Sequence, residues 1–194
     1  MSPVNRNSNI DYSGSGLDQF YSKNRFSWDQ LYESERRVLN KLPINANSSV
    51  LDVGCACGGL AAALKSKYSI EDYTGVEINE KNYQIAKSEI GHGRFINKDI
   101  LEITNEIPEY GFDIVFSLSC IDWNVEFDKM LEKIKRYVKP NGWLICSLRF
   151  TNQKSITSFE ESYQFINFDG RREGQKAPYI VLNFSEFISK LRLE

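Results

Sequence analysis

The chain has 194 residues, of which 41% are hydrophobic and 26% are charged, as in an ordinary globular domain with one sizeable core. Its formal net charge of −2 lacks the basic excess that general nucleic-acid binding requires, so we expect no DNA partner. No apolar run is long enough to span a membrane, and the polar start MSPVNRNSNIDYSGSG has no apolar core of a secretory signal. A cytoplasmic location is therefore the default expectation, and the oligomeric state stays open.

The first part of the chain divides into two segments. Residues 1–24 are rich in Ser, Asn and Gly, and we expect them to form a mobile N-terminal segment. In the following stretch, SWDQLYESERRVLNKLP, apolar residues recur at helical spacing. This pattern predicts one helix, which Ser27 caps and Pro43 ends.

From residue 49 onward, strand-like and helix-like segments alternate. The apolar, strand-like segments are SVLDVG, DYTGVEI, RFINKD, FDIVFSLS and GWLICSLRF, the last following a predicted turn at residues 140–142. The helix-like segments between them are GGLAAALKSKY, EKNYQIAKSEI and NVEFDKMLEKIKRYV, with Asn124 as the expected N-cap of the third. Such alternation predicts an α/β fold with a mostly parallel sheet covered by helices on both faces.

The C-terminal part of the chain is less regular. Residues 151–183 fit either a hairpin or a mobile insert on the substrate side. The segment SEFISKLRL predicts a final helix with Ser185 as its N-cap. With no internal repeat and no second core, residues 25–194 are expected to form a single domain.

The turn after the first strand carries the most unusual feature, the acid Asp52 in an apolar strand two residues before Gly54. In open α/β sheets, ligands bind beyond the carboxyl ends of the strands. A nucleoside triphosphate would need a GxxxxGK[ST] motif, which is absent. A dinucleotide would need GxGxxG, of which Gly54, Ala56 and Gly59 form a degraded version. The Asp52 carboxylate would also be unfavourable beside a pyrophosphate.

A ligand with positive charge fits this turn better. S-adenosylmethionine has a sulfonium and an α-ammonium group, which Asp52 would attract. Glu77 ends the second predicted strand, where a carboxylate can accept hydrogen bonds from a ribose. Asp99 ends the third, where it can accept from an adenine amino group while Ile100 packs on the ring. Each acid alone could equally be a helix cap or a loop residue. Because all three stand at the ends of consecutive strands, we expect them to line one edge of a single crevice.

At this point the chain resembles the class I S-adenosylmethionine-dependent methyltransferases over roughly residues 27–150. The motifs that carry the resemblance are VLDVGCACGG, GVEIN, NKDIL, FDIVFSLSCIDW and VKPNGWLICS. The resemblance implies a three-layer Rossmann-like sandwich of strand order 3-2-1-4-5, with S-adenosyl-L-methionine as cofactor and S-adenosyl-L-homocysteine as product. The family's terminal strands 6 and 7 are not visible in the pattern, and Ala56 replaces the second motif glycine.

The resemblance also implies which residues bind the cofactor. Around its methionine portion it places Asp52, Gly54, Cys55, Gly58, Leu118 and Ser119. Glu77 would hold the ribose, Ile78 would pack on the adenine, and Asp99 would reach the adenine amino group.

The sequence identifies no catalytic residue, because proximity and alignment can supply much of the barrier reduction for an in-line displacement. If a base exists, Asp122 is best placed, although it and Asn124 equally fit helix caps. Trp123 would then wall the substrate pocket.

A small-molecule acceptor is predicted by elimination. The segment SCIDW does not match the Asp-Pro-Pro-Tyr-like run of DNA amino-methyltransferases. The alternatives are a non-catalytic domain that binds the cofactor or its product as a regulator or partner, and an RNA or protein methyltransferase.

Several reactive or charged side chains have a simpler interpretation. The cysteines Cys55, Cys57, Cys120 and Cys146 lack a zinc-site spacing, so we interpret them as small buried residues and expect no metal. His92 is expected in a loop at the opposite edge of the sheet.

Two groups of side chains keep two interpretations each. One group would form an aromatic lid over the cofactor or pack on the sheet edge: Tyr12, Phe20, Tyr21, Phe26 and Trp28. The other would meet an anionic substrate or lie in solvated loops: Arg149, Arg171, Arg172 and Lys176.

Overall fold

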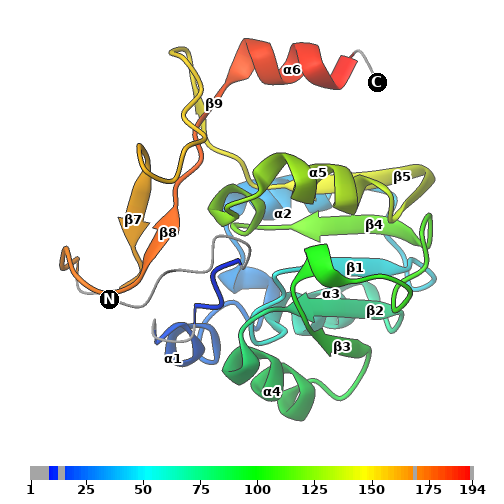
Figure 1. The fold of residues 1–194 in the computed structure, drawn as a ribbon. Coiled ribbons are helices and arrows are strands. Elements are labelled where there is room, and N and C mark those ends of the chain that lie inside the picture. Colours follow the sequence, from blue (N-terminus) through cyan, green and yellow to red (C-terminus); the bar gives the residue numbers. More distant parts are fainter. Residues whose placement is uncertain (1–8, 13–15, 168–169, 193–194) are drawn as a thin grey trace.

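The computed structural model describes residues 9–12, 16–167 and 170–192. A five-stranded parallel sheet forms its centre, and Figure 1 shows helices in front of it and behind it. The strands lie in the order β3-β2-β1-β4-β5, which confirms the predicted α/β fold and strand order. Their bounds are β1 Val50–Val53, β2 Tyr73–Glu77, β3 Arg94–Asn97, β4 Phe112–Ser117 and β5 Val138–Cys146.

Helices connect the strands and cover the sheet. The α-helices are α1 Leu17–Tyr21, α2 Glu33–Leu39, α3 Gly59–Tyr68, α4 Glu80–Glu89, α5 Phe127–Lys135 and α6 Phe184–Arg192. Short 3-10 turns are η1 Trp28–Gln30, η2 Ile100–Glu102 and η3 Ile121–Trp123. None of the helices in the described ranges is long and apolar enough to cross a bilayer.

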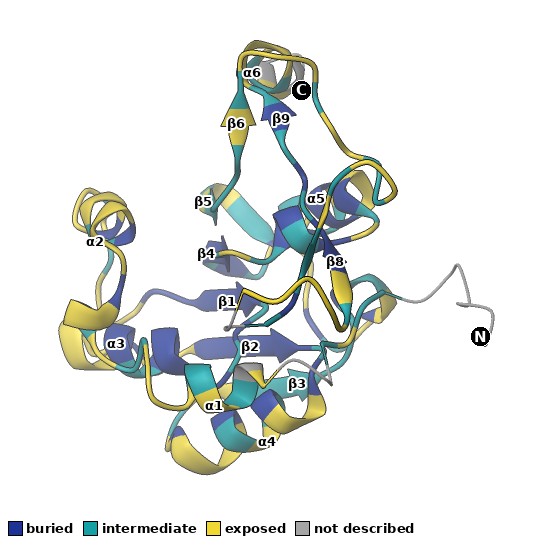
Figure 2. Ribbon diagram, turned by 90° about the vertical axis from the view of Figure 1, so that its left-hand side faces the viewer, coloured by how far each residue is buried: buried dark blue, intermediate teal, exposed yellow. Residues whose placement is uncertain are grey.

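The strand β1 is the centre of the core, and all four of its residues are buried (Figure 2). Because successive side chains of a strand point to opposite faces, Val50 packs in one cluster with Leu64 of α3. Leu51 packs in a second cluster with Ile134 of α5. A sheet covered on both faces needs apolar residues at nearly every strand position, so Asp52 requires a separate explanation.

The chain after β5 forms an arm outside the central sheet, which Figures 1 and 2 show extending away from it. Two small sheets build this arm. In one, β6 (Phe150–Thr151) pairs in parallel with β9 (Leu182–Asn183). In the other, β7 (Tyr163–Phe165) and β8 (Lys176–Pro178) form an antiparallel pair, so of the two alternatives for residues 151–183 the structure contains the hairpin.

The single helix predicted after Ser27 is wrong, because two capping interactions start two separate helical segments. The Gln30 side chain accepts a hydrogen bond from the Ser27 backbone N–H at 3.2 Å and closes η1. The Glu35 side chain accepts from the Tyr32 N–H at 2.9 Å and starts α2. Between them the backbone is extended, which allows Leu31 to enter the core.

The predicted cap of the last helix is also wrong by two residues. The helix α6 begins at Phe184, and the Asn183 Oδ1 atom accepts from the Glu186 N–H at 3.0 Å. Asparagine is as good an N-cap as serine, and Asn183 is held in β9 immediately before the helix.

Two further local predictions need correction. The Asn124 side chain accepts from the Glu126 N–H at 2.8 Å, so it closes the turn before α5 rather than capping the helix itself. Residues 140–142 lie within β5 and not before it, because the pairing of β4 with β5 shifts register there. The mobility expected for residues 1–24 stays a prediction, and its residues 1–8 and 13–15 lie outside the described ranges.

Ala56 has a left-handed backbone conformation, with φ of 48°. This conformation costs a residue with a side chain roughly 1–2 kcal/mol and costs glycine far less. Alanine at this position of the turn, where the family motif has glycine, therefore stores strain.

We expect the Ala56→Gly variant to raise the free energy of unfolding by about 1 kcal/mol. The matched control is Ala62→Gly inside α3, which should lower it by about 1 kcal/mol, because glycine is a poor helix former. Urea unfolding followed by circular dichroism measures both. Equal destabilisation in the two variants would contradict the strain at Ala56.

Candidate functional site

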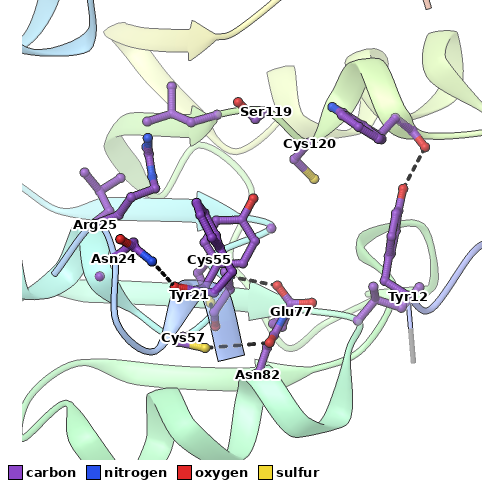
Figure 3. A pocket seen from close by; sticks show the side chains of 18 of the residues that line it. Tyr12, Tyr21, Asn24, Arg25, Cys55, Cys57, Glu77, Asn82, Ser119 and Cys120 are labelled. Atoms are coloured by element: carbon purple, nitrogen blue, oxygen red, sulfur yellow. Dashed lines mark hydrogen bonds between the residues drawn. The ribbon is translucent and has the colours of Figure 1, made fainter. Parts of the chain in front are cut away.

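A cavity of about 340 Å³ lies at the carboxyl ends of the parallel strands. Its floor is formed by the turn after β1, the end of β2 and the loop after β4 (Figure 3). These strands are neighbours at the position where the chain order reverses, which is where open α/β sheets bind ligands. Its remaining walls come from Tyr12, from residues 20–32 and from the arm at residues 164–167.

The glycine turn is packed too closely for a side chain at its first position. Gly54 has φ of 80°, and a Cβ atom there would lie 2.4 Å from the Cys120 Sγ atom. The Cys55 sulfur occupies the equivalent space beside Gly75, where a Cβ would lie 2.7 Å away. Burial raises the pKa of both thiols, so both stay protonated at neutral pH. In this packing each sulfur fills the space beside a glycine.

Asp52 is buried below this turn. The Tyr73 hydroxyl donates a hydrogen bond to its Oδ2 atom at 2.5 Å. Burial raises the pKa of Asp52 to about 6, although the Tyr73 hydrogen bond and the positive charge of Arg25 oppose the rise. An acid in this position carries a charge that the protein itself compensates only in part.

Glu77 links the turn to the end of β2. Its Oε2 atom accepts from the Ala56 N–H and its Oε1 atom from the Asn79 N–H, each at 2.8 Å. Burial raises the pKa of Glu77 to about 7, against these two hydrogen bonds. Each carboxylate oxygen has a further lone pair, so Glu77 can still accept hydrogen bonds from a ligand. In Figure 3 its side chain lies beside the turn and near Asn82.

Most of the predicted cofactor residues line the cavity, and three do not. The lining members are Asp52, Gly54, Cys55, Glu77, Ile78, Leu118 and Ser119. Gly58 instead faces Ile90 and Ala86 of the α4 region. Asp99 accepts from the Leu101 N–H at 2.9 Å, and Ile100 is in the core. The roles of all ten residues in cofactor binding stay predictions.

The substrate-side candidates separate in the same way. Trp123 lines the cavity, and its carbonyl accepts from the Tyr12 hydroxyl at 2.9 Å. Asp122 does not line it and instead pairs with Arg149 at 2.5 Å. The Arg149 guanidinium lies 4.8 Å from the Trp123 ring and 3.9 Å from the Tyr179 ring. Arg149 thereby attaches the arm to η3 beside the cavity.

The N-terminal aromatic residues also divide. Tyr12, Phe20 and Tyr21 line the cavity, whereas Phe26 and Trp28 pack against the core cluster of α3. The sequence analysis missed several other lining residues, chiefly Asn24, Arg25, Tyr32, Cys57, Leu60, Asn82 and Gln164–Asn167. Cys57 belongs to the motif VLDVGCACGG, where the sequence indicates only a packing role. The others match no motif, whether they lie in helices, as Leu60 and Asn82 do, or in irregular segments, so no local pattern identified them. His92 lies in the loop that precedes β3, at the amino-terminal end of that strand, as expected.

Comparison with known proteins identifies the family. Residues 51–146 match the family model described as a methyltransferase domain. The phosphoethanolamine N-methyltransferase of Plasmodium falciparum is 28% identical over 116 residues, covering 58% of this chain and 43% of that protein. The malonyl-[acyl-carrier protein] O-methyltransferase 2 of Ilyobacter polytropus is 21% identical over 184 residues, covering 88% of this chain and 71% of that protein.

A solved structure agrees in fold. It is the complex of the Haloferax volcanii Trm112 methyltransferase activator with a methyltransferase, which has a TM-score of 0.58 and 20% identity. The match covers 73% of this chain and 60% of that one. The family match and the methyltransferase relatives together support a class I S-adenosylmethionine-dependent methyltransferase.

Several of the methyltransferase motif residues of this chain line the cavity, among them Asp52, Gly54 and Glu77. The match begins at Leu51, beside Asp52, and ends at Cys146, where β5 ends. The arm after β5, which supplies one wall, lies outside the matched residues. The chain spans about half the length, or less, of several of the curated methyltransferases it matches.

The burial of Asp52 predicts a pH dependence of stability. Its pKa of about 6 in the folded protein lies above the ordinary 3.8. Its contribution to stability is therefore fully present below pH 3.8 and is lost as the pH rises through 6, by roughly 3 kcal/mol. The Asp52→Asn side chain cannot ionise. We expect this variant's melting temperature, relative to the unsubstituted protein, to rise between about pH 4.5 and about pH 7.5.

The control for this measurement is Asp72→Asn, because Asp72 is exposed in the loop before β2. Its melting temperature should differ from that of the unsubstituted protein by a constant amount across the same range. A pH-independent difference for Asp52→Asn would show that its carboxyl is not buried as described.

The Asp122–Arg149 pair predicts a strong non-additivity. Their side chains are 4% and 24% exposed, so Arg149→Met leaves a buried carboxylate unpaired. We expect a loss of about 3 kcal/mol in unfolding free energy near neutral pH. The double variant Asp122→Asn with Arg149→Met should recover at least half of this loss.

Urea unfolding of the two single variants and the double variant measures this coupling. The exposed pair Arg171–Glu173 supplies the control, and Arg171→Met should change stability by less than about 0.5 kcal/mol. A double variant no more stable than Arg149→Met would rule out the coupling.

Proposed function

We propose that this protein transfers the sulfonium methyl group of S-adenosylmethionine to a small-molecule acceptor by in-line displacement. The observation that carries this proposal is the pair of buried carboxylates, Asp52 and Glu77, at one cavity. Neither forms an ion pair with any described residue, although both are buried. Buried carboxylates without a counter-ion favour a cationic ligand.

The residues present fit the cofactor. When bound, S-adenosylmethionine supplies an electrophilic methyl group and a positive charge on sulfur. Asp52 and the turn at Gly54 would meet its methionine portion, since both line the cavity. Glu77 would accept from ribose hydroxyls, and Ile78 would pack on the adenine.

The chain's contribution to the reaction is mainly alignment. Cavity walls from Tyr12, residues 20–32 and residues 164–167 would exclude water and orient the acceptor towards the methyl group. We propose no role as a base for Asp122, because it pairs with Arg149 and does not line the cavity. We therefore propose no dedicated catalytic base.

Calorimetric titration tests the cofactor assignment. We expect micromolar binding of S-adenosylmethionine and S-adenosylhomocysteine and no binding of NAD. Binding of both sulfur ligands without methyl transfer to any acceptor would favour the non-catalytic alternative. Binding of NAD alone would refute the proposal.

Variants of the two carboxylates test the site. Asp52→Ala and Glu77→Ala should each weaken S-adenosylmethionine binding at least about tenfold, because each removes a charge or hydrogen-bond acceptor. The control is Glu89→Ala at the exposed end of α4, which should leave affinity unchanged. Circular dichroism confirms that each variant is folded. Unchanged affinity in both carboxylate variants would contradict the crevice assignment.

A further inference from the structure

The charges around the cavity exclude one class of acceptor. Among the described residues that line it, Asp52 and Glu77 are acids and Arg25 is the sole lysine or arginine. An acceptor with a carboxylate or phosphate needs a cationic partner in such a site, because an unpaired buried anion is costly. The question is therefore whether Arg25 can serve as that partner.

Arg25 is already bound to another residue. Its Nη2 atom donates to both carboxylate oxygens of Glu35, at 2.9 and 3.0 Å. The guanidinium also lies 4.8 Å from the centre of the Tyr32 ring. Glu35 is itself buried, so releasing Arg25 to an anionic ligand would leave a buried carboxylate without its counter-ion.

The other cations considered for an anionic substrate lie elsewhere. Arg149 pairs with Asp122, and Arg171 pairs with Glu173. The Lys176 ammonium lies 3.7 Å from the Tyr163 ring on the outer hairpin, and Arg172 is exposed. None of these four lines the cavity.

Aromatic rings dominate the walls above the cofactor turn. They come from three parts of the chain that are distant in sequence: Tyr12, Phe20, Tyr21 and Tyr32, then Trp123, then Phe165. Gln164 and Asn167 add uncharged amides to the same wall. Ring faces attract cations and exclude water, and each well-placed contact contributes about 0.5–2 kcal/mol.

We propose that the methyl acceptor is a small organic amine without a carboxylate or phosphate, bound among these rings. The inference rests on the proposed methyl transfer and specifies its acceptor. The amine approaches as a cation and loses a proton to water. Its nitrogen lone pair then forms the bond to the methyl carbon, while the carbon–sulfur bond breaks and its electron pair stays on sulfur. The product nitrogen carries one more methyl group.

Three probes that share a phenol ring test the charge preference. Tyramine is cationic, 4-ethylphenol is neutral and 4-hydroxyphenylacetate is anionic. Each is titrated calorimetrically into protein saturated with S-adenosylhomocysteine. We expect tyramine to bind about fivefold more tightly than 4-ethylphenol and about twentyfold more tightly than the anion. Equal or tighter binding of the anion, or equal binding of the neutral probe, would overturn the inference.

Two substitutions at Gln164 form a matched pair. The side chain is partly exposed on β7, so either charge is tolerated by the fold. Gln164→Glu should raise the affinity for tyramine relative to the anionic probe at least about threefold. Gln164→Lys should lower this ratio by a similar factor. Shifts in the same direction would contradict a charge-selective wall.

A ring variant tests the aromatic contribution. Trp123→Leu should weaken the binding of tyramine at least about fivefold. Phe165→Leu provides a second variant if the first does not fold. The control, Tyr110→Leu, removes a ring that is 60% exposed and does not line the cavity. An unchanged tyramine affinity in folded Trp123→Leu and Phe165→Leu would overturn the assignment of the rings.

Failure of this inference is distinguishable from failure of the proposed function. If S-adenosylhomocysteine does not bind, both are overturned. If it binds and the anionic probe is preferred, only the amine assignment is overturned.

Discussion

The two hydrogen bonds that the Glu77 carboxylate accepts hold the site in shape. One comes from the Ala56 N–H in the turn after β1, and the other from the Asn79 N–H after β2. They join two neighbouring strand ends and draw the glycine turn towards the cavity. The left-handed Ala56 is compatible with this arrangement because the same peptide unit makes the hydrogen bond. A local backbone cost is thereby offset by a hydrogen bond to a carboxylate, which is stronger than one between neutral groups.

Asp52 and Glu77 lose their hydration on folding, and hydrogen bonds from the protein replace only part of it. Tyr73 donates one hydrogen bond to Asp52, while Glu77 receives two from the backbone. Burial raises both pKa values towards neutrality. A cationic ligand would complete the compensation, so the same energetic deficit that costs stability in the free protein favours binding. The proposed amine acceptor is also a cation, so the negative charge of these acids would favour the acceptor as well as the cofactor.

The cavity is assembled from segments that the central sheet does not hold. The Tyr12 hydroxyl reaches the Trp123 carbonyl, and the Asn79 side chain donates to the Asp11 carbonyl. On the other side, the Ile180 N–H donates to the Asp122 carbonyl, beside the Arg149 pair. The turn η3 is therefore where the N-terminal segment, the sheet and the arm meet.

The sequence by itself determined the parallel α/β fold, and the resemblance of its motifs to a known family implied the strand order. It also predicted that Asp52 and Glu77 share one crevice, and both line the cavity. Those features follow from alternating patterns and short motifs, which are local and therefore legible along the chain. Only the tertiary structure decided that Asp99 caps η2 outside the cavity, that Arg149 is bound by Asp122, and that Arg25 is bound by Glu35. These outcomes depend on which side chains meet across distant segments. No spacing in the sequence encodes that choice, because packing and charge compensation are settled only when the whole chain has folded.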